Sequence, residues 1–97
     1  MRPSTSIAEH GDQVREILDR AGLHNARLFG SAARGEDTDE SDIDLLVEAP
    51  LGTTLYDLAR VELALEDLLG CKVEVVTHGF LAPDVAKNVE ADLTPIP

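Results

Sequence analysis

The sequence is poor in aromatic residues and in cysteine. The first shortage excludes a core rich in aromatic side chains, and the second excludes an internal disulfide. Only 3% of its 97 residues are aromatic, so the core has to be built mainly from Leu, Val, Ile and Ala. The single cysteine, Cys71, cannot form an internal disulfide, and we interpret it as a small half-buried residue rather than a catalytic thiol. No apolar run approaches the roughly 18 residues of a membrane span or resembles a signal peptide. These absences predict a cytoplasmic protein with no membrane partner.

Positive charge is also scarce. Eight Lys and Arg stand against nineteen Asp and Glu, which gives a formal net charge of −11. Such a surface repels the phosphates of nucleic acid, so we expect no direct nucleic-acid partner. It suits a divalent cation, a cationic small molecule or a basic protein, although acidity that serves only solubility explains it equally well.

The length fits one small domain over residues 1–97, without internal repeats or linkers. Two capping boxes, Ser6 to Glu9 and Thr54 to Asp57, each precede an amphipathic stretch that ends at a glycine. The expected helices cover residues 7–21, 55–69 and 84–93, the expected strands cover 26–30, 42–48 and 72–77, and residues 94–97 are expected to fray. This order predicts an α/β (α+β) fold, in which helices pack on one face of a small mixed sheet. Three strands make a thin sheet, and a partner in a homo- or hetero-oligomer is able to cover its edge.

The strand at residues 42–48 contains two aspartates. Alternation places Ile43, Leu45 and Val47 on a buried face, and puts Asp42 and Asp44 together on the other face. Two such negative charges ~6 Å apart repel by about 3 kcal/mol at an effective dielectric of about 20, unless a cation neutralises them. Mg²⁺ is the expected cation, because it binds one or two carboxylates together with substrate phosphates.

A phosphate site is available just upstream. Gly30 and Ser31 end a short apolar run and open a turn whose backbone N–H groups are able to hold a polyphosphate, and Arg34 adds a positive charge. Arg34 either contacts the phosphate or supports the turn. The stretch lacks the Gly-Lys-Ser/Thr ending of a P-loop, and Gly30 and Gly35 are also what an ordinary tight turn uses.

Gly30-Ser31, ten intervening residues and Asp42-Ile43-Asp44 together resemble the signature of the nucleotidyltransferase superfamily that includes DNA polymerase beta. The fuller stretch "GSAARGEDTDESDIDLLV" is similar to the minimal nucleotidyltransferase (MNT) domains, which are antitoxins of HEPN ribonuclease toxins. The resemblance implies transfer of AMP from ATP to a hydroxyl of the partner toxin, and a tyrosine hydroxyl is the expected acceptor. It also implies two Mg²⁺ ions bound by Asp42 and Asp44, and a nucleotide site formed by Gly30, Ser31, Arg34 and Ser41.

The family places a third carboxylate, usually Asp, on a neighbouring strand, and the matching residue here is Glu74. Its extra methylene shifts the carboxylate by about 1 Å, an error that can cost on the order of 10²-fold in rate. Glu74 is therefore either a third metal ligand and catalytic residue or a surface glutamate paired with a lysine. The alternative function is an MNT binding module with weak or no catalysis, which neutralises its partner by contact alone. Modification of a cationic aminoglycoside is a third reading, but related enzymes carry an added substrate domain.

The other polar residues give weaker signals. We expect the three histidines to be surface residues, because they lack metal-ligand spacing. We also expect the acidic run from Glu36 to Glu40 to form a solvated loop, and Tyr56 to pack in the first turn of its helix. The histidines are His10, His24 and His78.

Overall fold

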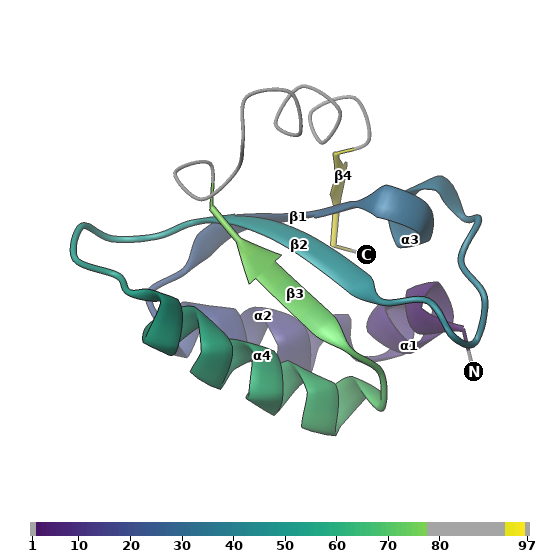
Figure 1. Ribbon diagram of the computed structural model, residues 1–97, viewed down its shortest axis with the longest axis horizontal. Coiled ribbons are helices and arrows are strands. Elements are labelled where there is room, and N and C mark those ends of the chain that lie inside the picture. The colour runs from purple at the N-terminus through teal and green to yellow at the C-terminus, as the bar shows by residue number, and fades with distance from the viewer. Residues whose placement is uncertain (1, 78–92, 97) are drawn as a thin grey trace.

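The computed structural model describes residues 2–77 and 93–96 and contains a four-stranded mixed sheet (Figure 1). The strand order is β3-β2-β1-β4, in which β2 and β3 are parallel and the other pairs are antiparallel. Helices α1, α2 and α4 lie on one side of the sheet, and α3 lies at one end of it (Figure 1). The predicted α+β fold with a mixed sheet is thus confirmed. The elements are α1 Pro3–Glu9, α2 Gly11–Arg20, β1 His24–Phe29, α3 Gly30–Arg34, β2 Ile43–Glu48, α4 Leu55–Leu69, β3 Val73–Val76 and β4 Thr94–Pro95.

The core lies between the helices and one face of the sheet. Alternate strand residues point into it, as the period-2 pattern predicts, and the stripe of leucines on α4 packs against them. The strand residues buried in this core are Leu28, Ile43, Leu45, Val47, Val73 and Val75, and the buried helix residues include Val14, Leu18, Leu58, Val61 and Leu65. The opposite face of the sheet is therefore left to Phe29, Asp44 and Glu74 and their neighbours.

Helix α4 begins and ends at the predicted residues. The Thr54 hydroxyl accepts a hydrogen bond from Asp57 N–H at 3.3 Å, and the Asp57 carboxylate accepts one from Thr54 N–H at 2.9 Å. Gly70 ends the helix in the left-handed conformation, with φ of 73°. Both caps are local, so the sequence alone is enough to predict them.

The helix predicted over residues 7–21 is wrong in one respect, because the structure has two helices there. Pro3 begins α1, the helix is interrupted at His10, and Gly11 begins α2. Ser6 does not cap a helix; its hydroxyl donates a buried hydrogen bond of 2.9 Å to the carbonyl oxygen of Leu69 at the end of α4. A contact between distant residues has replaced the local capping box.

The end of the chain also differs from the prediction. Thr94 and Pro95 form an edge strand paired with Leu28 and Arg27 of β1, where frayed residues were expected. The helix predicted over residues 84–93 lies almost entirely outside the described residues. No helix within the described ranges is long and apolar enough to cross a membrane.

Candidate active site

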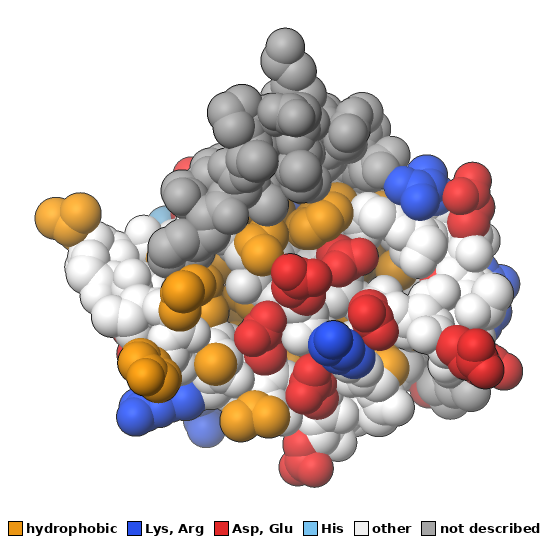
Figure 2. All heavy atoms as spheres, in the orientation of Figure 1, with side chains coloured by type: hydrophobic (Ala, Val, Ile, Leu, Met, Phe, Trp, Pro, Cys, Tyr) orange, Lys and Arg blue, Asp and Glu red, His pale blue; other side chains and the backbone are white. Residues whose placement is uncertain are grey.

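Asp44 lies at the centre of the candidate site, on the face of the sheet that points away from the core. Its Cα is paired with that of Phe29 on β1 and with that of Glu74 on β3. Adjacent strands lie ~4.8 Å apart, so Asp44 and Glu74 are direct neighbours on one face. Asp42 is exposed and lies just before β2. The structure therefore makes Asp44 and Glu74 neighbours and places Asp42 close enough for its charge to act on Asp44. Figure 2 shows several acidic side chains near the centre of its view.

The charge on Asp44 is unfavourable in its present surroundings. Partial burial, together with the negative charges of Glu74 and Asp42, raises the pKa of its carboxyl group from 3.8 to about 6. A bound cation would reverse this effect, because an opposite charge favours the ionised form. The perturbed carboxyl group is thus a candidate functional group on physical grounds.

Gly30 is required at its position for two reasons. Its φ of 73° lies in the left-handed region, and a Cβ atom built on it would lie 2.6 Å from Oδ2 of Asp44. Any other side chain would have to displace that carboxylate. The glycine is therefore more than an ordinary turn residue, because it lets the backbone of the phosphate turn approach the carboxylates.

The turn predicted after Gly30 is in fact a five-residue helix, α3. Phe29 precedes it in an extended conformation and makes no side-chain cap. The first N–H groups of a helix have no partner within the helix, so those around Gly30 and Ser31 are left to bind an external acceptor. This end of α3 lies beside Asp44, and the arrangement suits a phosphate held between backbone N–H groups and a carboxylate-bound cation.

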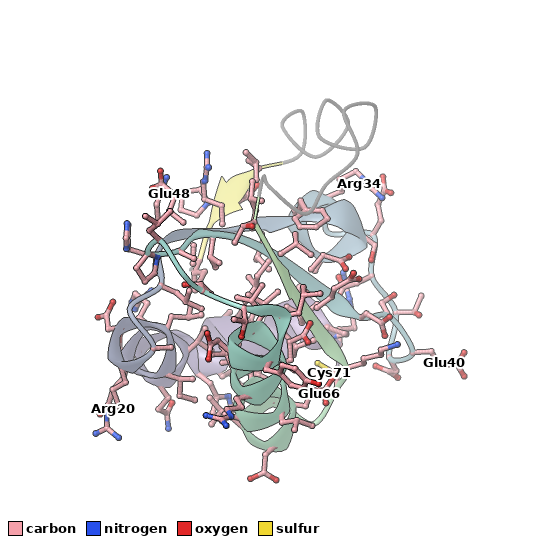
Figure 3. The ribbon with its side chains drawn as sticks, turned by 60° about the vertical axis from the view of Figure 1, so that its left-hand side comes forward. Arg20, Arg34, Glu40, Glu48, Glu66 and Cys71 are labelled. Atoms are coloured by element: carbon pink, nitrogen blue, oxygen red, sulfur yellow. The ribbon has the colours of Figure 1, made fainter. Side chains whose placement is uncertain are left out.

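Arg34 and Ser41 lie at the margin of the site, and each has a partner in the protein. The Arg34 guanidinium, at the far end of α3, donates to Glu36 at 3.1 Å (Figure 3). The Ser41 hydroxyl accepts a hydrogen bond from Thr38 N–H at 2.9 Å, and Ser41 N–H donates to the Thr38 carbonyl oxygen at 3.0 Å. Ser41 therefore closes the turn that leads into Asp42.

Asp37 contradicts the prediction of a solvated acidic loop. It is only 5% exposed, and its carboxylate accepts hydrogen bonds of 2.8 Å from both Ser4 N–H and the Ser4 hydroxyl. The Arg2 guanidinium donates to the same carboxylate at 2.9 Å and to the Gly35 carbonyl oxygen at 2.8 Å. We call this group of Arg2, Ser4 and Asp37 the loop clamp. It attaches the segment between α3 and Asp42 to the start of α1, and no local sequence signal could have revealed it.

The loop clamp makes stability depend on pH below about 4. Burial by itself would raise the pKa of Asp37, but the hydrogen bonds from Ser4 and Arg2 and the Arg2 charge outweigh it and lower the pKa from 3.8 to about 2. We expect Asp37→Asn to lower the free energy of unfolding by about 2 kcal/mol at pH 7. The difference should vanish as the pH falls through 2, because the wild-type carboxylate is then protonated too. Urea unfolding of both proteins across this range measures it.

Glu40→Gln is the matched control for that measurement. Glu40 is in the same acidic run but is exposed at the outside of the loop (Figure 3). Its substitution should change the free energy of unfolding by less than about 0.5 kcal/mol at any pH. An equal loss in the two variants would mean that net charge, and not the clamp, sets the stability.

Glu74 is exposed, and within residues 2–77 and 93–96 it makes no ion pair with a lysine or arginine. The reading of Glu74 as a surface glutamate paired with a lysine thus finds no support there. In the same part of the chain, no three His, Cys, Asp or Glu side chains are grouped as a complete metal site. The donors nevertheless fit Mg²⁺, which takes one or two protein carboxylates and completes its shell with phosphates and water.

The tyrosine, the cysteine and the described histidines show no sign of a catalytic role. Tyr56 is 81% exposed, so the prediction that it packs in the first turn of α4 is wrong. Cys71 is half-buried, and burial together with the charges of Asp42, Glu66 and Asp37 raises the pKa of its thiol, as expected for an unreactive cysteine. The His10 ring contacts the Ser6 carbonyl oxygen and the exposed His24 ring that of Gly22, whereas His78 lies outside the described residues.

Comparison with known proteins agrees with this geometry. The family model described as "Nucleotidyltransferase domain" matches residues 12–95. MJ0435 of Methanocaldococcus jannaschii, provisionally named a protein adenylyltransferase, is 41% identical over 78 residues, which cover 80% of this chain and 84% of that protein. The protein adenylyltransferase MntA of Thermococcus cleftensis is 36% identical over 75 residues, covering 77% and 76% of the two chains.

Solved structures give the same result. A structure provisionally described as a minimal nucleotidyltransferase is 42% identical and superposes with a TM-score of 0.82, covering 98% of this chain and 96% of that one. A toxin–antitoxin structure with AMP-PNP has a TM-score of 0.78 at 20% identity, covering 89% of this chain and 71% of that one. At 20% identity, the similarity to the toxin–antitoxin structure shows a shared fold only.

Proposed function

This chain belongs to the nucleotidyltransferase domain family, and we propose that it transfers AMP from ATP to a hydroxyl group of a partner toxin. The observation that carries the proposal is the meeting of Asp44 and Glu74 on adjacent strands, beside the uncapped start of α3. Paired carboxylates next to the first backbone N–H groups of a helix are able to hold a metal-bound polyphosphate. The names of the adenylyltransferase relatives supply the nucleotide and the kind of acceptor.

Asp42, Asp44 and Glu74 are the residues that would hold Mg²⁺. Two such ions supply charge stabilisation at the reacting phosphate and at the pyrophosphate that leaves. Asp44 contributes most when ionised, and its raised pKa means that without a cation nearby its negative charge is unfavourable. The site is thereby suited to gaining a cation together with the nucleotide.

The other residues of the site bind and orient the substrates. Backbone N–H groups at Gly30 and Ser31 would donate to phosphate oxygens, which fixes the nucleotide relative to Asp44. Glu74 is exposed and would accept the proton of the attacking hydroxyl. Arg34 and Ser41 also belong to the proposed nucleotide site. To contact the nucleotide, Arg34 would have to release Glu36 and Ser41 would have to release Thr38.

We propose a HEPN-type toxin as the partner and a tyrosine hydroxyl as the acceptor. A toxin–antitoxin complex is the printed description of the fold neighbour with AMP-PNP. The strongly acidic chain suits a basic partner. Large apolar side chains exposed on α4 and in the loop before it suit contact with a protein. They are Leu51, Leu55, Tyr56 and Leu63.

The second candidate function is an MNT binding module that neutralises its partner by contact alone. It is favoured by one observation: Glu74 replaces the family's usual aspartate, and its carboxylate is not gathered with the aspartates into a complete metal site among the described residues. Contact through the exposed apolar residues of α4 would then be sufficient.

The deciding experiment incubates the protein with Mg²⁺, ATP and the protein product of the neighbouring gene. Label from the α-phosphate of ATP should appear on that partner, whereas label from the γ-phosphate should not, because pyrophosphate leaves. Asp42→Ala should abolish the labelling. If wild type transfers no label and Asp42→Ala still suppresses the partner's ribonuclease activity, the binding module is the correct function.

A further inference from the structure

The outer edge of β3 is occupied by side chains of α4. Strand β3 is at the end of the sheet and pairs with β2 on one side only. Hydrogen bonding alternates along a strand, so the N–H groups of Val73 and Val75 point away from β2. The first donates to Oε2 of Glu66 at 3.1 Å, and the second donates to Oε2 of Glu62 at 2.8 Å. We call Glu62 and Glu66 the glutamate ladder.

The spacing of the ladder matches that of the strand. Residues four apart on a helix are displaced by about 6.0 Å along its axis, and residues two apart on a strand by about 6.6 Å. Two glutamates one turn apart are therefore able to meet two alternate N–H groups, as a neighbouring strand would. Figure 3 shows Glu66 near Cys71, at the end of α4 that leads into β3.

Glu74 lies between the two residues that the ladder holds. Its neighbours Val73 and Val75 are fixed from outside by the glutamates, and the strand is fixed from inside by pairing such as that from Ile43 N–H to the Lys72 carbonyl oxygen at 2.9 Å. The pairing of β3 with β2 sets the position of the Glu74 Cα opposite that of Asp44. Partners for its outer N–H groups should make local opening of this four-residue edge strand less frequent.

We propose that Glu62 and Glu66 are positioning residues, which hold Glu74 opposite Asp44 by occupying the outer hydrogen-bond positions of β3. The proposal rests on the proposed function, in which Glu74 is the third carboxylate of a metal–nucleotide site. It assigns the ladder no contact with nucleotide or metal. Residues that orient metal ligands from outside the first shell typically affect metal affinity by 10- to 100-fold.

The test compares the double variant Glu62→Ala/Glu66→Ala with Glu62→Gln/Glu66→Gln, which keeps a carbonyl oxygen for each N–H group. Two quantities are measured: amide hydrogen exchange at Val73 and Val75, and the affinity for Mn²⁺ in the presence of AMP-PNP, from the electron paramagnetic resonance signal of free Mn²⁺. The alanine variant should exchange faster at both amides and bind Mn²⁺ about 10-fold more weakly. The glutamine variant should stay within about 3-fold of wild type.

Two controls on the same helix separate positioning from loss of charge or stability. Asp67→Ala removes one carboxylate outside the ladder, and Leu68→Ala removes a partly buried core contact. Both should leave the Mn²⁺ affinity unchanged, although Leu68→Ala lowers the melting temperature. If Leu68→Ala weakens Mn²⁺ binding as much as the alanine double variant does, the ladder is merely structural and the proposal is overturned.

The remaining outcomes distinguish this inference from the function it rests on. If wild type binds Mn²⁺ with AMP-PNP and the alanine variant binds equally well despite faster exchange, the positioning role is wrong and the proposed function stands. If wild type binds neither Mn²⁺ nor AMP-PNP, both the proposed function and the positioning role are wrong.

Discussion

Replacing Asp44 with Asn is expected to lower the rate of AMP transfer by about 10³-fold while making the metal-free protein more stable. The loss of rate follows because a carboxylate that holds the metal contributes several kcal/mol to the transition state, and each 1.36 kcal/mol is a factor of ten. The gain in stability follows from the pKa of Asp44, which rises from 3.8 to about 6 on folding. Holding the charged carboxylate at pH 7 thus costs on the order of 1 to 3 kcal/mol, which Asn avoids.

The raised pKa of Asp44 also predicts how the stability of the protein changes with pH. Because the folded pKa of Asp44 is the higher one, wild type should lose this part of its stability as the pH rises from about 4 through 6. The Asn variant should not. Thermal unfolding in EDTA at pH 4 and pH 7 measures the difference, which should be near zero at pH 4 and about 5 to 15 °C at pH 7. A variant no more stable than wild type at pH 7 would contradict the assigned environment of Asp44.

Replacing Gly30 with Ala is expected to lower the transfer rate by about 10² to 10³-fold and to destabilise the fold by about 1 to 2 kcal/mol. The stability loss comes from the left-handed φ of 73°, which an L side chain adopts at a cost. The loss of rate comes from the new Cβ, 2.6 Å from Oδ2 of Asp44, which forces the carboxylate to move. A displacement of about 1 Å at a reacting site is enough for this effect.

Gly35→Ala is the matched control, because Gly35 has nearly the same φ, 70°, and a Cβ there would meet nothing within 4 Å. The two variants should lose similar free energies of unfolding, measured in urea, while the labelling assay should detect the loss of rate only at Gly30. Equal activity in both would mean that the close approach to Asp44 has no functional role.

The parts of this fold that local physics determines were predictable. Strand β2 follows from the alternation of Ile43, Leu45 and Val47, and helix α4 follows from its capping box and from Gly70. The same alternation put Asp42 and Asp44 on the face opposite the core. The carboxylates and the glycine of the site were thereby located from sequence, together with the neighbouring position of Glu74.

The parts that depend on distant residues were not predictable. The hydroxyl of Ser6 looked like a helix cap and instead bonds Leu69, and Asp37 looked like a loop residue and instead binds Ser4. Helix α3 is too short for a periodic signal, and β4 exists only by pairing with β1. The glutamate ladder gives no signal either, because two glutamates four apart are common on any exposed helix face.

The two edges of the sheet limit how this protein is able to assemble. On one side, the glutamate ladder already occupies the N–H groups that a new strand would need. On the other, β4 is two residues long and includes Pro95, which has no N–H to donate. Among the described residues, both edges of the sheet therefore disfavour the addition of a strand from another copy. A concentrated solution should therefore resist fibril formation through these two edges.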